Sequence, residues 1–266
     1  MKITIDTIDL AYADHGIGQP VIFLHAFPLN RMMWEGQIAA LLREQRYRLV
    51  APDWRGFGES GIVEGTPSTM DLFARDIAGL MDALGMRQAV LCGLSMGGYA
   101  AMAFYRQHPE RVSGLILADT RPNADNEEGR ANREQLAQVA EREGPDAVAD
   151  RQLPRLLAAE TRKHHPEVEA RVRSMIATAT PYGIAAASRG MAQRQDSTAL
   201  LAHITCPTLV IVGAEDGLTP PAVAHAYAGQ IPGAQLAQIA HAGHLSNLEQ
   251  PEAFYTVVSN FLQAHF

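Results

Sequence analysis

The sequence predicts an α/β domain with a mostly parallel sheet, helices on both sides of it and an inserted helical lid. Short apolar runs alternate with longer stretches of helical periodicity, which is the pattern of repeated βα units. That alternation stops between about residues 121 and 201 and resumes near residue 208. The length of 266 residues suits one large domain, or one domain with an insertion.

Each predicted strand is a short, mainly apolar run, as expected for strands that are buried on both faces of a parallel sheet. The runs are Val21–Ala26, Tyr47–Asp53, Ala89–Gly93, Leu115–Asp119 and Thr208–Gly213. Apolar residues three and four positions apart predict amphipathic helices between and after these strands. The helical stretches are Arg31–Glu44, Ser68–Leu84, Met96–His108, Pro220–Gln230 and Pro251–Gln263.

The predicted lid lies between about Arg121 and Leu201, where strand-like runs are absent and Ala, Glu, Arg and Gln dominate. Its helix breakers favour several short helices. These breakers are Gly144-Pro145, Pro154, Pro166 and Pro181. Because strand-like sequence resumes after it, this stretch is interpreted as an insertion. We expect a core domain of residues 1–120 and 202–266 and a lid of residues 121–201.

Composition excludes several classes of function. Lys and Arg number 22 against 29 Asp and Glu, a net charge of −7, and no dense basic block is present. Nucleic acids and anionic membranes are therefore poor partners. No apolar run is long enough for a membrane helix, and the first ten residues do not form a signal peptide. With only Cys92 and Cys206, no disulfide framework is expected. We expect a cytoplasmic protein and leave its oligomeric state open.

The strongest local signal is Gly93-Leu94-Ser95-Met96-Gly97, which follows a predicted strand and precedes a predicted helix. A sharp turn in this context strains the backbone of Ser95 and exposes its hydroxyl at the carboxyl end of the sheet. The flanking glycines allow the strand and helix to approach closely. The alternative is a Gly-rich turn with a solvated serine; we favour Ser95 as a nucleophile.

A serine nucleophile needs a base and an acid that orients the base. His244 follows the last strand-like run and precedes the last helix, at the same sheet edge as Ser95; His241 is its rival. Asp216 follows the strand after the lid, whereas Asp119 ends an earlier strand and is the rival acid. The chain order Ser, Asp, His favours a catalytic set of Ser95, Asp216 and His244.

The oxyanion hole requires two backbone N–H donors. The amides of Met96 and Phe27 are the candidates, since Pro28 has no N–H. His25, at the end of its strand, is a candidate pocket residue whose alternative role is to brace its loop. The apolar lid residues that could line the substrate pocket are Met175, Ile176, Tyr182, Ile184 and Met191.

These motifs together resemble the α/β-hydrolase superfamily over nearly the whole chain. The resemblance is carried by GLSMG, the HAFP loop, Asp53–Ser60, the turn Gly213–Asp216 and Gly243-His244. The lid and the stretches ITCPTLVIVGAEDGLTPP and HAGHLSNLEQP are similar to the branch of 3-oxoadipate enol-lactonases and small carboxylesterases. Ala26 departs from the glycine usual in that family, and Asp53–Ser60 is implied to be a structural loop.

The resemblance implies a serine-dependent hydrolase of small carboxylic esters that acts through an acyl-enzyme. Lactone opening, perhydrolysis without a cofactor, and ligand reception with little turnover are the alternatives. A serine at the nucleophile position argues against dehalogenase and epoxide hydrolase chemistry, which needs a carboxylate there. No dinucleotide- or ATP-binding motif occurs, so we expect no cofactor and no metal. The expected partner is a small ester or lactone.

Overall fold

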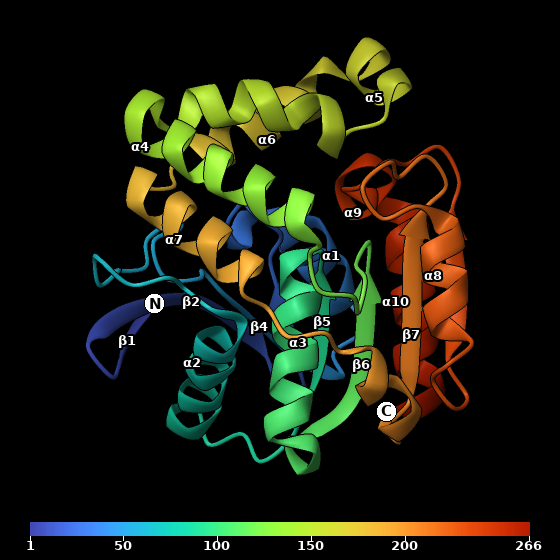
Figure 1. The fold of residues 1–266 in the computed structure, drawn as a ribbon. Helices are drawn as coiled ribbons and strands as arrows, with labels where there is room; N and C mark the ends of the chain where they lie inside the picture. Colours follow the sequence, from blue (N-terminus) through green and yellow to red (C-terminus); the bar gives the residue numbers. More distant parts are fainter.

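An eight-stranded sheet forms the centre of the computed structural model, which describes residues 1–266 (Figure 1). The strands lie in the order β1-β2-β4-β3-β5-β6-β7-β8. The six strands from β3 to β8 are parallel to one another. The bounds of the strands are β1 (Lys2–Ile5), β2 (Ile8–Gly16), β3 (Gln19–Leu24), β4 (Tyr47–Pro52), β5 (Ala89–Leu94), β6 (Val112–Ala118), β7 (Thr208–Gly213) and β8 (Gln235–Ile239). The predicted α/β-hydrolase fold class, a mostly parallel sheet with an inserted helical region, is confirmed.

Three strands, the two edge strands β1 and β8 and the strand β2 beside β1, were not delimited by the sequence. β1 and β2 form an antiparallel hairpin, and β2 also pairs antiparallel with β4. Each of these three strands contains exposed residues, and β8 contains the polar residues Gln235 and Gln238. A search for continuous apolar runs finds strands that are buried on both faces and misses strands that are half exposed.

Helices cover both faces of the sheet because each central strand is apolar on both sides. In β3, Ile22 and Leu24 belong to one hydrophobic cluster, and Val21 and Phe23 belong to the other. The first cluster also contains residues of α2 (Met70–Ala83), α3 (Met96–Gln107) and α8 (Pro221–Ala228). The second contains residues of α1 (Glu35–Leu42), which a 3-10 turn (Arg31–Trp34) precedes, and of α10 (Pro251–His265).

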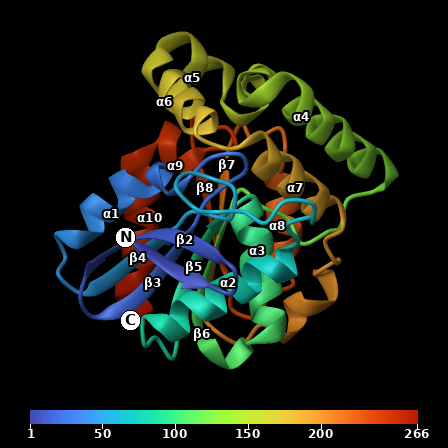
Figure 2. The ribbon, with the colours of Figure 1, turned by 90° about the vertical axis from the view of Figure 1, so that its left-hand side faces the viewer.

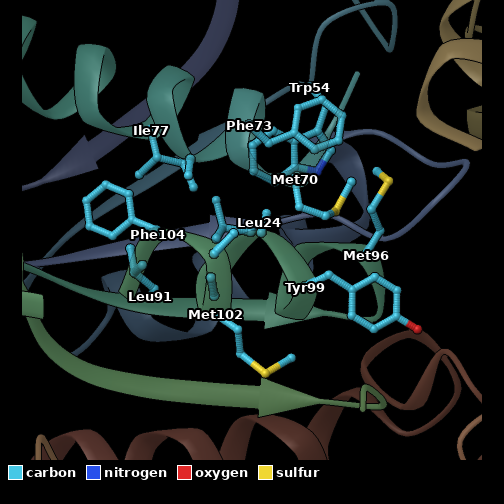
Figure 3. Close-up of a cluster of buried hydrophobic side chains, with 14 of the residues drawn as sticks. Leu24, Trp54, Met70, Phe73, Ile77, Leu91, Met96, Tyr99, Met102 and Phe104 are labelled. Carbon is cyan, nitrogen blue, oxygen red and sulfur yellow. The ribbon is translucent and has the colours of Figure 1, made fainter. Parts of the chain in front are cut away.

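The first cluster supports the loop that follows β4 and the start of α3. Figure 3 shows Trp54 against Phe73 of α2, with Met96 and Tyr99 in the first turn of α3. The rings of Trp54 and Phe73 are stacked, with centroids 4.5 Å apart. All four side chains are at least nine-tenths buried. Ser95, the residue directly before Met96, is therefore adjacent to a tightly packed part of the core.

The helical insertion lies above the carboxyl ends of β6 and β7 in Figure 1. It comprises α4 (Glu127–Leu156), α5 (Ala159–His164), α6 (Pro166–Ala177), α7 (Pro181–Ala192) and a 3-10 turn (Thr198–His203). Pro166 and Pro181 begin helices, as first-turn prolines do. No helix of the chain has both the length and the apolar character needed to cross a membrane.

Of the two breaks expected within α4, the one at Gly144-Pro145 is present and the one at Pro154 is absent. The two halves of α4 meet at Gly144, whose φ of 84° produces a kink, and Pro145 starts the second half at once. Pro154 lies inside that half and does not end it. The helix continues because apolar residues of α4 are held against the rest of the molecule: Leu136 packs in the first cluster and Leu153 in the second. Figure 2 shows α4 and α6 together above the sheet.

Candidate active site

Ser95 occupies a strained turn between β5 and α3. Its φ of 55° and ψ of −112° lie in a region that non-glycine residues rarely adopt. The two glycines of the turn cannot be replaced without displacement. A Cβ on Gly97 would lie 2.0 Å from the carbonyl oxygen of Leu24, and one on Gly93 would lie 2.3 Å from that of Gly97. The turn thus holds the Ser95 side chain at the carboxyl edge of the sheet.

Ser95, His244 and Asp216, three residues far apart in the sequence, form one hydrogen-bonded chain. The Oγ of Ser95 is 2.8 Å from Nε2 of His244, and Nδ1 of His244 is 2.8 Å from Oδ2 of Asp216. A neutral imidazole that carries its proton on Nδ1 donates to the carboxylate and accepts from the serine hydroxyl. His244 and Asp216 are each 3% exposed, so water competes little for these bonds.

Asp216 is held in its ionised form. The amides of Leu218 and Thr219 donate to Oδ1 at 2.8 and 3.0 Å, and the hydroxyl of Thr219 donates to Oδ2. Burial opposes ionisation, but the charge of His244 and these hydrogen bonds outweigh it and lower the pKa of Asp216 to about 2.

Asp216 in turn raises the pKa of His244. Burial favours the neutral imidazole and lowers the pKa, but the charge of Asp216 and its hydrogen bond raise it above the ordinary value. An imidazolium formed at this position is therefore stabilised by Asp216. A group with these properties can take a proton from Ser95 and return it later.

The rival acid, Asp119, lies one strand away and does not contact His244. Its Oδ1 accepts from the amide of Gly213 at 2.7 Å, and its Oδ2 accepts from the hydroxyl of Ser246. Burial raises the pKa of Asp119 to about 7. Asp119 thus joins the loop before Asp216 to the loop after His244. The rival base, His241, lies on the surface outside this chain of hydrogen bonds.

The amides of Phe27 and Met96 are both free to bind an anion. Neither donates a hydrogen bond within the protein. Met96 is the first residue of α3, where N–H groups lack intrahelical partners. The side chain of Phe27 shares a cavity wall with Ser95 and His244. Ala26, the departure from glycine, buries its methyl group in the second hydrophobic cluster, so the fold accommodates it.

A cavity of about 470 Å³ opens beside Ser95 and His244. Its walls come from the core and from the insertion, and most of them are polar. The residues of α4 that line it include Asn132, Arg133, Gln135, Arg151, Gln152 and Arg155, and Arg121 and Asp125 precede that helix. Sequence reasoning missed these side chains because charged residues on a helix usually face solvent. The one available signal was the spacing of Arg151 and Arg155, which puts both on one face.

Of the six expected pocket residues, only Met191 lines this cavity. Met175 and Ile176 are buried in the second hydrophobic cluster and Ile184 in the first, because the insertion needs apolar anchors on the core. Tyr182 is 43% exposed at the surface. Most apolar residues of the insertion therefore attach it to the core, and of these Leu136, Leu156 and Met191 also line the cavity.

His25, the remaining expected pocket residue, braces its loop. Its Nε2 accepts from the amide of Trp54 at 3.0 Å, and its Nδ1 lies 2.9 Å from the carbonyl of Ala26. Its own carbonyl accepts from the indole of Trp54 at 3.0 Å. Burial lowers the pKa of His25 to about 4, so it stays neutral near pH 7. The alternative role given to His25 in the sequence analysis agrees with this placement.

The fold and this arrangement of side chains define the class of protein: the chain belongs to the alpha/beta hydrolase fold family, which matches residues 19–251. It is 30% identical over 254 residues to 3-oxoadipate enol-lactonase 2 of Acinetobacter baylyi, across 95% of this chain and 92% of that protein. A malate-bound thermophilic esterase from Thermogutta terrifontis is 45% identical, with a TM-score of 0.95 over 100% of this chain and 99% of the esterase. The enol-lactonase of Burkholderia xenovorans LB400 is 30% identical, with a TM-score of 0.91 over 99% and 100%.

Proposed function

We propose that the protein hydrolyses small carboxylic esters through an acyl-enzyme on Ser95. The observation that carries this proposal is the hydrogen-bonded chain from Ser95 through His244 to Asp216, at the wall of a cavity. In this proposal Ser95 is the nucleophile, His244 the general base and acid, and Asp216 the group that orients and stabilises the imidazolium.

The reaction proceeds in two halves. Ser95 Oγ attacks the ester carbonyl while Nε2 of His244 takes its proton, and the amides of Phe27 and Met96 stabilise the oxyanion. Collapse of the tetrahedral intermediate breaks the bond to the alcohol, which leaves with the proton from His244. Water then attacks the acyl-enzyme with the same assistance, and the carboxylic acid departs. Residues 121–201 act as a lid that completes the cavity above Ser95.

Two kinds of relatives support this reaction class. The esterase of Thermogutta terrifontis supports simple esters, and the enol-lactonases of Acinetobacter baylyi and Burkholderia xenovorans support cyclic esters. Lactone opening is therefore the second candidate; it uses the same residues, with the leaving alcohol still tethered to the acyl group. Chromogenic acyl esters, an enol-lactone and a simple lactone, assayed side by side, separate the two candidates.

Ser95→Ala tests the role of the nucleophile. We expect the variant to fold normally, to lose covalent labelling by a fluorophosphonate probe, and to lose several orders of magnitude in turnover, because the three residues act as a unit. Ser174→Ala, at an exposed serine of α6, is the matched control and should label fully. Labelling that persists in Ser95→Ala, or maps to another serine by mass spectrometry, contradicts the assignment.

A further inference from the structure

The cavity beside Ser95 is strongly basic in an acidic protein. Four arginines line it, Arg121, Arg133, Arg151 and Arg155, against the single acid Asp125. Positive charge in the wall therefore exceeds negative charge by three, whereas the whole chain carries a net charge of −7. A cleft lined by one sign of charge concentrates ligands of the opposite sign.

Asp125 does not neutralise this wall, because three guanidinium groups share its one carboxylate. Arg121 lies 2.8 Å from Oδ1, and Arg133 and Arg194 lie 3.2 and 2.7 Å from Oδ2. Although burial opposes ionisation, Arg194 and Arg133 lower the pKa of Asp125 to about 2. The carboxylate of Asp125 is ionised near pH 7. Its single negative charge does not balance the three positive charges of the arginines that contact it, so this cluster carries a net positive charge.

Two of the wall arginines have donors without acceptors. Arg155 makes no hydrogen bond and no ion pair, although it lies one helical turn from Arg151 on α4. The Nε of Arg121 is buried and has no hydrogen-bond partner. That atom has no surface open to the cavity, so a ligand can reach Arg121 only through the rest of its side chain, which is 34% exposed. Of the four buried side-chain atoms left without a partner, this is the one in a residue that lines the cavity.

Anchoring the lid explains only part of this charge. Arg133 and Arg194 hold Asp125 and so fix the start of the insertion to α4 and to the segment that follows α7. Arg155 holds nothing, and Arg151 meets only Glu143, at 3.3 Å with both side chains half exposed. Arg151 and Arg155 are both exposed to solvent, and both line the cavity that opens beside Ser95.

We propose that the substrate carries a second, anionic group, a carboxylate, which binds to Arg155 and Arg121 while its ester carbonyl lies against Ser95. The inference rests on the proposed ester hydrolysis and names its substrate class: monoesters of short dicarboxylic acids. A carboxylate matches the planar guanidinium with two parallel hydrogen bonds, and bonds between charged groups are stronger than neutral ones.

The test compares monomethyl succinate, which carries one carboxylate, with the neutral dimethyl succinate. The measured quantity is the ratio of kcat/KM for the anionic ester to that for the neutral ester. Arg155→Gln should lower this ratio on the order of tenfold, and Arg155→Glu should lower it further. Arg155→Lys should restore part of the ratio because it keeps the charge. Arg142→Gln, an exposed arginine of the same helix outside the cavity wall, is the matched control and should leave the ratio unchanged.

Failure of this inference is distinguishable from failure of the proposed function. Absence of ester turnover in the wild-type protein, or turnover that persists in Ser95→Ala, would refute ester hydrolysis on Ser95 itself. Normal turnover of dimethyl succinate with an equal ratio in wild type, Arg155→Gln and Arg155→Glu would refute only the anion site. Calorimetry of succinate with Ser95→Ala gives a second readout: we expect saturable binding that Arg155→Glu abolishes, and binding that is absent from Ser95→Ala, or unaltered by Arg155→Glu, overturns the proposal.

Discussion

Asp216 and Asp119 are buried carboxyl groups at the ends of neighbouring strands, yet their environments move their pKa values in opposite directions. Burial dominates at Asp119 and raises its pKa to about 7. At Asp216 the charge of His244 and donors from Thr219 outweigh burial and lower the pKa to about 2. The direct contact with His244 makes the difference, because an opposite charge within hydrogen-bond distance favours ionisation more than a distant one.

This contrast predicts unequal effects of two isosteric substitutions. Asp216→Asn should lower kcat by about 10⁴, because an amide neither stabilises the imidazolium nor fixes the tautomer of His244. Asp119→Asn should lower it far less, because Asp119 makes no hydrogen bond to His244 and acts on the imidazole only through its charge. Steady-state kinetics on one ester, with circular dichroism to confirm folding, give the comparison. A larger loss in Asp119→Asn would move the orienting acid to the earlier strand.

The raised pKa of His244 predicts the acid limb of the pH profile. Only the neutral imidazole can take the proton of Ser95, so activity rises as His244 loses its own proton. Since the pKa is above 6.5, the limb in kcat/KM should have its midpoint above pH 6.5. Asp216→Asn should shift this midpoint to lower pH, because the charge that holds the proton is gone. A midpoint below that of an ordinary histidine in the wild-type protein would contradict this prediction.

The link between the insertion and the loop of His244 runs through Glu249, on the short helix α9 (Ser246–Glu249). Its Oε2 accepts from the amide of Ala158 at 2.8 Å and from the hydroxyl of Thr161 at 2.7 Å. Its Oε1 accepts from the amides of Gly243 at 2.9 Å and Leu245 at 3.3 Å, the two neighbours of His244. One buried carboxylate therefore fixes the lid and the candidate base to each other.

Glu249→Gln should weaken both elements. The amide of glutamine presents donors where the protein offers only donors, so we expect a loss of about 1–3 kcal/mol in the free energy of unfolding. We also expect lower kcat, since the His244 loop loses its support. Urea denaturation and steady-state kinetics measure the two effects. Glu252→Gln, exposed on α10, is the control. A Glu249→Gln protein with wild-type stability would remove the proposed support.

The elements that the sequence predicted well are those whose physical cause is local. The strands from β3 to β7 are buried on both faces and appear in the sequence as apolar runs. The glycines on either side of Ser95 indicate the sharp turn there. The walls of the cavity depend instead on which face of α4 meets the core. Arg155 is solvent-exposed, as its sequence suggests, and it lines the cavity only because the kink at Gly144 and the packing of Leu153 set the direction of the helix. Sequence periodicity alone does not contain that information.

The insertion and the α/β core form one packed body, since both hydrophobic clusters contain residues of each. Leu136 and Ile184 of the insertion lie in the first cluster, and Leu153 and Ile176 lie in the second. Most of the apolar surface of the insertion is therefore buried against the core. What remains for the cavity, apart from Leu136, Leu156 and Met191, is mainly polar.

A small cavity with mainly polar walls predicts a preference for short acyl chains. Each methylene that finds an apolar wall gains roughly 0.8 kcal/mol, and longer chains find few such walls here. Activity should peak at acetate to butyrate esters and fall for octanoate and longer ones. The measurement is kcat/KM across an acyl series with one leaving group. A maximum at eight carbons or more, or a jump in rate above the solubility limit of the substrate, would indicate a lipase.

The positive φ of Ser95 makes the residue needed for activity unfavourable for the stability of the folded protein. A serine in this backbone region costs on the order of 1–3 kcal/mol, a strain that glycine would not carry. Ser95→Gly is thus a single step toward a more stable and inactive protein. A population of variants screened for thermal resistance alone will drift toward losing its nucleophile, and only a screen that also demands turnover will retain it.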